Sequence, residues 1–183
     1  MQLMSNVSRH QMSDLQSLAH QKSAANLQRR IDALPAAIQA LQRKLAPQGL
    51  GLSGNMLQQV EELCSASIRE YGDTLTTEYR WAISQALFVS QSWVERLIVE
   101  ANALLEALHS ACKKHVEQAI SMVSVPRAGP GLLAELAKSH TSAQDQVALG
   151  LRSAFSERKR GVVRALPSLV FRLISRIFSG GHP

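Results

Sequence analysis

The sequence predicts an all-α protein: an elongated helical hairpin or bundle with a long central helix and a basic amphipathic C-terminal helix. Three observations support this fold class. Leu, Ala and Gln, which favour helices, are abundant in the 183 residues. Apolar residues recur at steps of three and four, and β-branched residues form no alternating run of the kind found in strands. The 45% hydrophobic content is enough for a core.

The first 26 residues differ in composition from the rest. Residues 1–26 are rich in Ser and Gln and contain one acidic residue, Asp14. This composition is typical of a frayed helical start, and also of transit peptides, which are Ser-rich and poor in acids. We therefore predict a flexible or targeting-like segment. A targeting role would favour secretion by a non-classical bacterial route over a cytoplasmic location.

A leucine-rich seam follows this segment. Its apolar residues alternate steps of four and three, which places them along one side of a helix. The seam is predicted to pack against a neighbouring helix or a second copy of itself, and it consists of Leu27, Ile31, Leu34, Ile38, Leu41 and Leu45. Pro35 interrupts the pattern and predicts a kink or a helix restart near Asp32–Pro35.

Residues 27–123 are predicted to form one hairpin or coiled-coil body. After a connector rich in helix breakers, at 47–54, a second helix is expected over 55–71 and is weakened by Gly72. A third helix is expected over 76–123, which would be about 70 Å long at 1.5 Å per residue. Short helices cannot easily cover a helix of that length, so the pattern predicts a homo-oligomer.

Two prolines and two glycines make residues 124–131 a predicted linker. The C-terminal module is expected over 132–183, with a short helix at 132–138 and a capping box at Thr141 that begins the next helix. Residues 152–183 contain seven basic residues and one acidic residue, while the rest of the chain sums to zero. This region therefore holds the whole net charge of +6, which predicts an acidic partner.

The basic tail has the pattern of an amphipathic helix. Its apolar residues gather in one arc of roughly 180°, with most arginines on the other side, and Pro167 predicts a bend. Such a helix can insert its apolar face among lipid acyl chains while its arginines pair with phosphates. The predicted membrane- or partner-binding residues are Arg158, Lys159, Arg160, Arg164, Leu166, Leu169, Arg172, Leu173, Arg176, Ile177 and Phe178.

Four interactions are possible for this tail on the sequence alone. It could pack on the protein's own helices, lie on an anionic membrane surface, occupy an acidic groove of a partner protein, or bind nucleic acid. Nucleic acid is the weakest of the four, because the tail has few aromatic residues and a wide apolar face. We therefore predict a non-enzymatic accessory factor that acts as a membrane-associated or scaffold protein, in the cytoplasm or peripheral to a membrane.

The chain contains no motif of an enzyme active site. Glu106, His109, Cys112 and His115 follow one another at steps of three, but the set drifts by roughly 180° around a helix, so at most two or three could converge on one ion. We therefore predict a surface or core-edge cluster with no metal or cofactor. Cys64 and Cys112 are far apart in the sequence and are predicted to be core residues of a protein in a reducing compartment. The chain lacks an uncharged apolar run of bilayer length, so no transmembrane helix is expected.

One segment resembles the BH3 helix of Bcl-2-type apoptosis regulators. That motif has apolar anchors at about i, i+4, i+7 and i+11, and a Gly-Asp pair follows the third anchor. The matching residues are the anchors Cys64, Ile68, Tyr71 and Leu75, together with Gly72 and Asp73. The resemblance implies an alternative function, a helical regulator that binds a protein groove.

Overall fold

A computed structural model describes the backbone of residues 2–50, 53–123 and 129–178, and the side chains of residues 10–50, 53–123 and 129–160. These residues form helices and no strand, which confirms the predicted all-α class. The elements are α1 (Gln2–Leu45), the 3-10 turn η1 (Ala46–Gln48), α2 (Gly54–Gln85), α3 (Gln91–Met122) and α4 (Gly129–Phe178).

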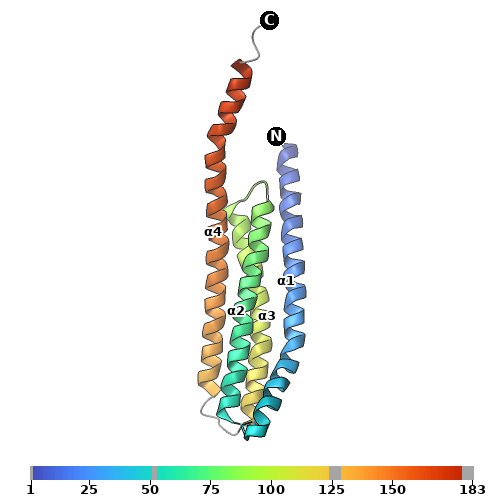
Figure 1. Cartoon of the computed structure of the whole chain (residues 1–183). Helices are drawn as coiled ribbons and strands as arrows, with labels where there is room; N and C mark the ends of the chain where they lie inside the picture. The colour runs from blue at the N-terminus through green and yellow to red at the C-terminus, as the bar shows by residue number, and fades with distance from the viewer. Residues whose placement is uncertain (1, 51–52, 124–128, 179–183) are drawn as a thin grey trace.

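The four helices form an elongated bundle (Figure 1). Successive helices run in opposite directions, so α2 is parallel to α4 and α1 is parallel to α3. The helices α2 and α3 lie at the centre, with α1 packed on one side of this pair and α4 on the other. Within the described residues α1 and α4 do not contact each other. Each central helix therefore has three neighbours, whereas each outer helix has two.

This arrangement explains where the core lies. All but one of the largest fully buried side chains belong to α2 or α3, and the exception is Leu136 on α4. Two aromatic residues of the core also bind α1 through their polar atoms. The Tyr71 hydroxyl donates a hydrogen bond to the Ser23 carbonyl at 3.0 Å, and the Trp93 indole N–H donates to Gln16 at 2.9 Å. Buried Tyr and Trp need such partners, and here the partners position α1 on the central pair.

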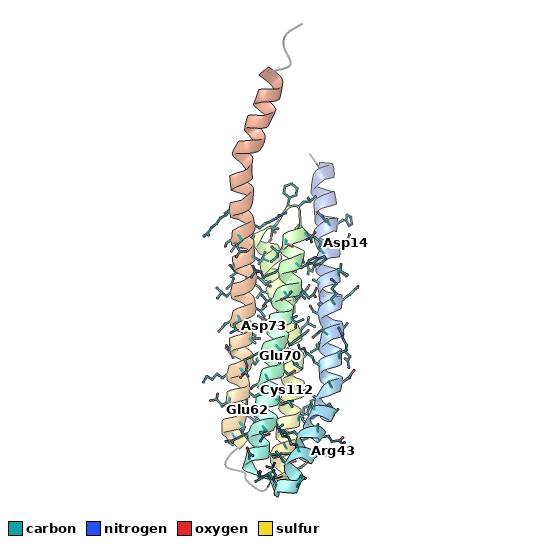
Figure 2. All side chains as sticks on the ribbon, in the orientation of Figure 1. Asp14, Arg43, Glu62, Glu70, Asp73 and Cys112 are labelled. Carbon is teal, nitrogen blue, oxygen red and sulfur yellow. The ribbon has the colours of Figure 1, made fainter. Side chains whose placement is uncertain are left out.

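The helix α1 spans the length of the bundle, from Asp14 near one end to Arg43 near the other (Figure 2). The leucine-rich seam faces the core: three of its residues are buried, and the other three are partly buried against the core. The buried residues are Leu27, Leu34 and Leu45, and the partly buried ones are Ile31, Ile38 and Leu41. On the rim of this interface Arg30 pairs with Glu70 of α2 at 3.2 Å.

Residues 10–26 lie in α1, although their composition predicts a flexible or targeting-like segment. Ala19 and Ser23 of this segment are buried, and their small side chains let α1 approach the central helices closely. The predicted helix restart at Pro35 does not occur: α1 continues through this exposed residue. Within α1, Pro35 removes one backbone N–H donor from the helix and its ring crowds the preceding turn, which favours a bend. Figure 1 shows that the last turns of α1 lean toward the other helices.

The predicted long central helix over 76–123 is wrong. The chain turns at 86–90, and two helices, α2 and α3, pack against each other in place of one. Ser90 caps the start of α3, since its hydroxyl accepts the Trp93 N–H at 3.2 Å. The reversal lets both apolar faces be buried inside one chain. The uncovered helix that suggested a homo-oligomer is therefore absent, and the oligomeric state stays a prediction.

The helix breaks predicted at Gly72 and Thr141 are also absent, because α2 and α4 are each continuous. Gly72 lies where α4 comes close: a Cβ at this position would be 3.3 Å from the Cβ of Ala143. The Thr141 hydroxyl donates to the Ala137 carbonyl one turn earlier, at 3.1 Å. The short helix and the capping box expected for the C-terminal module are both part of the single helix α4.

A second close approach between α2 and α4 lies further along the two helices. A Cβ added to Gly150 would be only 2.7 Å from Cγ2 of Thr76. The Thr76 hydroxyl donates to the Gly72 carbonyl at 2.9 Å, which favours the rotamer that points the methyl group at α4. The absence of a side chain at Gly150 therefore sets how closely the two helices pack.

We predict that Gly150→Leu lowers the free energy of unfolding by about 1–3 kcal/mol, because the new side chain overpacks the contact with Thr76. Gly131→Leu is the matched control, since nothing lies within 4 Å of a Cβ at Gly131. The control should change the free energy by less than about 0.5 kcal/mol. Urea denaturation measures both values, and equal stabilities for the two variants would contradict the close approach.

Candidate functional site

The structure describes the side chains of three predicted tail residues, Arg158, Lys159 and Arg160. Lys159 and Arg160 are exposed, whereas Arg158 is half-buried and donates a hydrogen bond to the Ala86 carbonyl at 3.0 Å. The remaining predicted residues lie outside the described side chains, although the backbone of α4 continues as a helix to Phe178. They are Arg164, Leu166, Leu169, Arg172, Leu173, Arg176, Ile177 and Phe178.

The bond between Arg158 and Ala86 joins α4 to the connection between α2 and α3. Two apolar residues of this connection, Leu87 and Phe88, are 64% and 69% exposed. Figure 1 shows that the connection lies at the end of the bundle from which α4 continues. Apolar and basic side chains therefore share one end of the molecule, which we name the bundle tip: Leu87, Phe88, Arg158, Lys159 and Arg160.

The charged residues of α4 just before the bundle tip are paired within the chain. Arg152 donates two hydrogen bonds to Glu95, each at 3.0 Å, and these bonds hold the pKa of the Glu95 carboxyl below its ordinary value. Glu157 pairs with Arg80 at 3.3 Å. No acidic residue follows Glu157 in the sequence, so the basic residues after it have no acidic partner within the tail.

The two cysteines face each other between α2 and α3. The sulfur of each lies 3.9 Å from the backbone carbonyl oxygen of the other, and both are free and buried. The interaction with Cys64 and, after it, burial raise the pKa of the Cys112 thiol above its ordinary value. Both residues occupy the core positions that the sequence predicts, and neither is available as a surface nucleophile.

The BH3-like segment is part of the same core. Its four anchors are fully buried, and the glycine that follows the third one packs against Ala143 of α4. A partner groove would have to replace the intramolecular neighbours of α2, which requires α2 to leave the bundle. The anchors are Cys64, Ile68, Tyr71 and Leu75, with Gly72 beside them.

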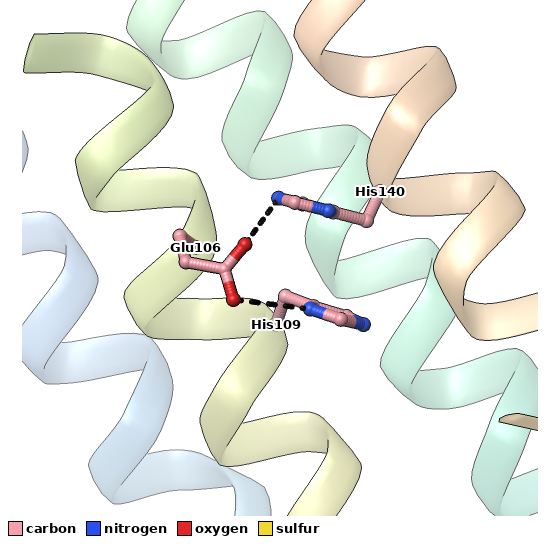
Figure 3. A group of neighbouring side chains, drawn as sticks. All are labelled: Glu106, His109 and His140. Carbon is pink, nitrogen blue, oxygen red and sulfur yellow. Dashed lines mark ion pairs between the residues drawn. The ribbon is translucent and has the colours of Figure 1, made fainter. Parts of the chain in front are cut away.

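A second group of polar side chains joins α3 to α4 (Figure 3). Glu106 and His109 lie one turn apart on α3, and His140 approaches them from α4. Nδ1 of His109 is 3.6 Å from one carboxylate oxygen of Glu106, and Nε2 of His140 is 3.4 Å from the other. The two imidazole rings are stacked, with centroids 4.4 Å apart and planes 6° from parallel. We name these three residues the histidine cluster.

The composition of the histidine cluster differs from the predicted one. Cys112 is in the core beside Cys64, and neither it nor His115 belongs to the group of ligand atoms that lie within 4.8 Å of one another. His140 takes their place, although it follows His109 by 31 positions in the sequence. No local spacing could have indicated it, because only the antiparallel packing of α3 and α4 brings the two imidazoles together.

Burial determines the protonation of His140. Burial lowers the pKa of this imidazole below its ordinary value, the adjacent His109 lowers it further, and Glu106 acts in the opposite direction. His140 is therefore neutral at pH 7, so one of its ring nitrogens carries a free lone pair. Neither Nδ1 of His109 nor Nε2 of His140 has a hydrogen-bond partner in the described structure.

Comparisons of the chain with models of known protein families, with curated proteins and with solved structures found no match. In the part of the chain that the structure describes, no helix is both long and apolar enough to cross a membrane. Among the described residues, the bundle tip and the histidine cluster are the two features from which the proposals below are argued.

We predict that Cys64 and Cys112 react with a thiol reagent about a hundredfold more slowly in the native protein than in concentrated guanidinium chloride, because the α2–α3 interface must open first. A Ser121→Cys variant gives an exposed thiol on α3 and serves as the control. Counting modified thiols over time by absorbance checks the prediction. Native labelling of Cys112 at the rate of the control thiol would contradict its burial.

Proposed function

We propose that this chain is a non-enzymatic helical protein that binds an anionic membrane surface through its bundle tip and basic C-terminal tail. The observation that supports the proposal most directly is the meeting of two kinds of side chain at one end of the bundle. Leu87 and Phe88 are exposed there, and Arg158 connects them to the beginning of the basic tail.

The apolar part of the bundle tip suits the boundary between lipid headgroups and acyl chains. A folded protein gains nothing from holding Leu87 and Phe88 in water, and adjacent exposed apolar side chains often mark an interaction surface. Transfer of each such side chain out of water contributes roughly 1.5–3 kcal/mol. Two side chains of this size would provide a shallow, reversible anchor.

The charged part suits an anionic surface. Lys159 and Arg160 are exposed directly after Arg158, and three more arginines follow in the tail without any acidic residue among them. Each basic side chain near an anionic leaflet contributes about 1 kcal/mol. The neutral remainder of the chain, by contrast, has no net charge that would orient it on a membrane. The charge distribution therefore favours attachment by this end.

Arg158 lies where α4 extends beyond the two central helices. Arg158 binds Ala86, the residue that caps the end of α2, so α4 passes the ends of α2 and α3 at this point. The apolar arc predicted from the sequence begins after it. The backbone of α4 continues as a helix from there to Phe178, and we propose that the apolar arc meets a membrane surface.

Sedimentation with vesicles tests the proposal. The wild-type chain should bind vesicles that contain phosphatidylserine and bind phosphatidylcholine vesicles weakly. The variant Leu87→Ser with Phe88→Ser should weaken binding by more than about a hundredfold, since each side chain contributes roughly 1.5–3 kcal/mol and about 1.4 kcal/mol is tenfold. Leu149→Ser is the matched control, because Leu149 is 71% exposed on α4 away from the tip, and its binding should equal that of the wild type.

Variants of the tail test its two faces separately. Leu169→Glu with Leu173→Glu should abolish binding to both kinds of vesicle, since each change puts a charge into the acyl boundary. Changing Arg164, Arg172 and Arg176 to Gln should weaken binding to the anionic vesicles only, and most strongly at low salt. If the arginine changes instead abolish binding to duplex DNA with a steep salt dependence, the partner is nucleic acid.

A shortened chain that ends at Gly161 separates an exposed tail from a packed one. It keeps Arg158 and all the described contacts of α4, so its melting temperature should equal that of the full chain, while vesicle binding is lost. A large fall in melting temperature would mean that the tail belongs to the core. That result would contradict the proposal.

A further inference from the structure

The geometry of the histidine cluster points to a metal site: we propose that Glu106, His109 and His140 bind a divalent transition-metal ion of the Zn²⁺ type, which clamps α4 to α3. Two imidazole nitrogens and one carboxylate form a three-ligand set that suits zinc and leaves a further position for water. The ligand atoms come from two helices and lie within 4.8 Å of one another.

The distances in the cluster fit a shared ion better than direct hydrogen bonds. The imidazole nitrogens are 3.6 Å and 3.4 Å from the carboxylate oxygens of Glu106, which exceeds the usual 2.7–3.2 Å of a hydrogen bond. Ligand atoms placed tetrahedrally about zinc at 2.0–2.1 Å are roughly 3.3 Å apart. The two nitrogen–oxygen separations are within a few tenths of an ångström of that value, whereas the full set of three ligand atoms, which lies within 4.8 Å of one another, has to draw together around the ion.

The burial of His140 is a second, independent indication of a ligand. Its side chain is 9% exposed, and Nε2 points to the cluster without a hydrogen-bond partner. The Nδ1 atom of His109 is in the same state. Buried nitrogens normally have a partner, and a single ion at the edges of the two rings, in line with the nitrogen lone pairs, would satisfy both of them. Figure 3 shows the two nitrogens facing the same carboxylate.

The surroundings of the cluster are favourable for a cation. The nearby Lys113 pairs with Glu117 at 3.9 Å, so it does not neutralise Glu106. The Ser110 hydroxyl donates to the Glu106 carboxylate at 3.4 Å and helps to orient it, as outer-shell partners do at metal sites. Binding of both nitrogens to one ion requires the stacked rings to tilt away from parallel.

Such an ion would connect the helix that bears the tail to the centre of the bundle. Glu106 and His109 belong to α3, and His140 belongs to α4, so separation of the two helices would break the coordination. Metal binding to the folded state alone stabilises that state. The proposal does not depend on membrane binding, because it concerns residues far from the bundle tip.

Titration calorimetry of the full, tag-free chain with Zn²⁺ tests the site. We expect one ion per chain, with His140→Gln and Glu106→Gln each weakening the affinity at least about tenfold. His115→Ala is the matched control on the same helix, and it should bind as the wild type does. Glu106 is exposed, so its variant cannot fail for lack of folding. Equal affinity in the wild type and both cluster variants would overturn the proposal.

Co²⁺ absorption gives an independent measurement of the ligands. Binding at the histidine cluster should produce d–d bands typical of nitrogen and oxygen ligands, and these bands should disappear in His109→Ala. Zn²⁺ should also raise the melting temperature of the wild type and leave that of His140→Gln unchanged. A strong thiolate charge-transfer band would place the ion at the cysteines and overturn the proposal.

Discussion

The close packing of α2 on α4 is the contact on which both candidate sites depend. It is made possible by small side chains at two places, Gly72 opposite Ala143 and Gly150 opposite Thr76. The two contacts follow one another in the same direction along the parallel helices α2 and α4. They therefore determine which residues of α4 contact α2 and α3. The same register puts His140 beside α3 and brings Arg158 to the end of α2. A bulky residue at either glycine would disturb both places.

The sequence indicates the helical class and the burial of the cysteines, because both depend on local periodicity and composition. It misleads at the turn over 86–90, where Leu87 and Phe88 continue the helical pattern although they are exposed. Ser90, which caps α3, is one of many serines in the sequence, so on its own it is a weak indication of a helix start. A glycine such as Gly72 is typical of a helix break, but here it lets α4 approach α2 closely. Only the tertiary packing shows this role. His140 was missed for the same reason.

The helix α4 contains two parts with different physical properties. As far as Glu157 most of its charges are paired, as in the double hydrogen bond between Arg152 and Glu95, and its apolar residues contribute to the core. After Glu157 every charged residue is basic. Arg158 marks the boundary, because it binds the capping residue of α2. A neutral bundle thus supports a cationic segment, and the proposed metal clamp would act on the part of α4 that carries it.

Hydrogen–deuterium exchange with and without anionic vesicles tests this division of α4 most directly. We expect vesicles to slow exchange in the tail after Arg158 and at the connection that contains Leu87 and Phe88. Exchange in the centre of α2 and α3, around Cys64 and Cys112, should stay unchanged. Slower exchange restricted to the middle of the bundle, or no change in the tail, would contradict the claim that this end of the molecule binds membranes.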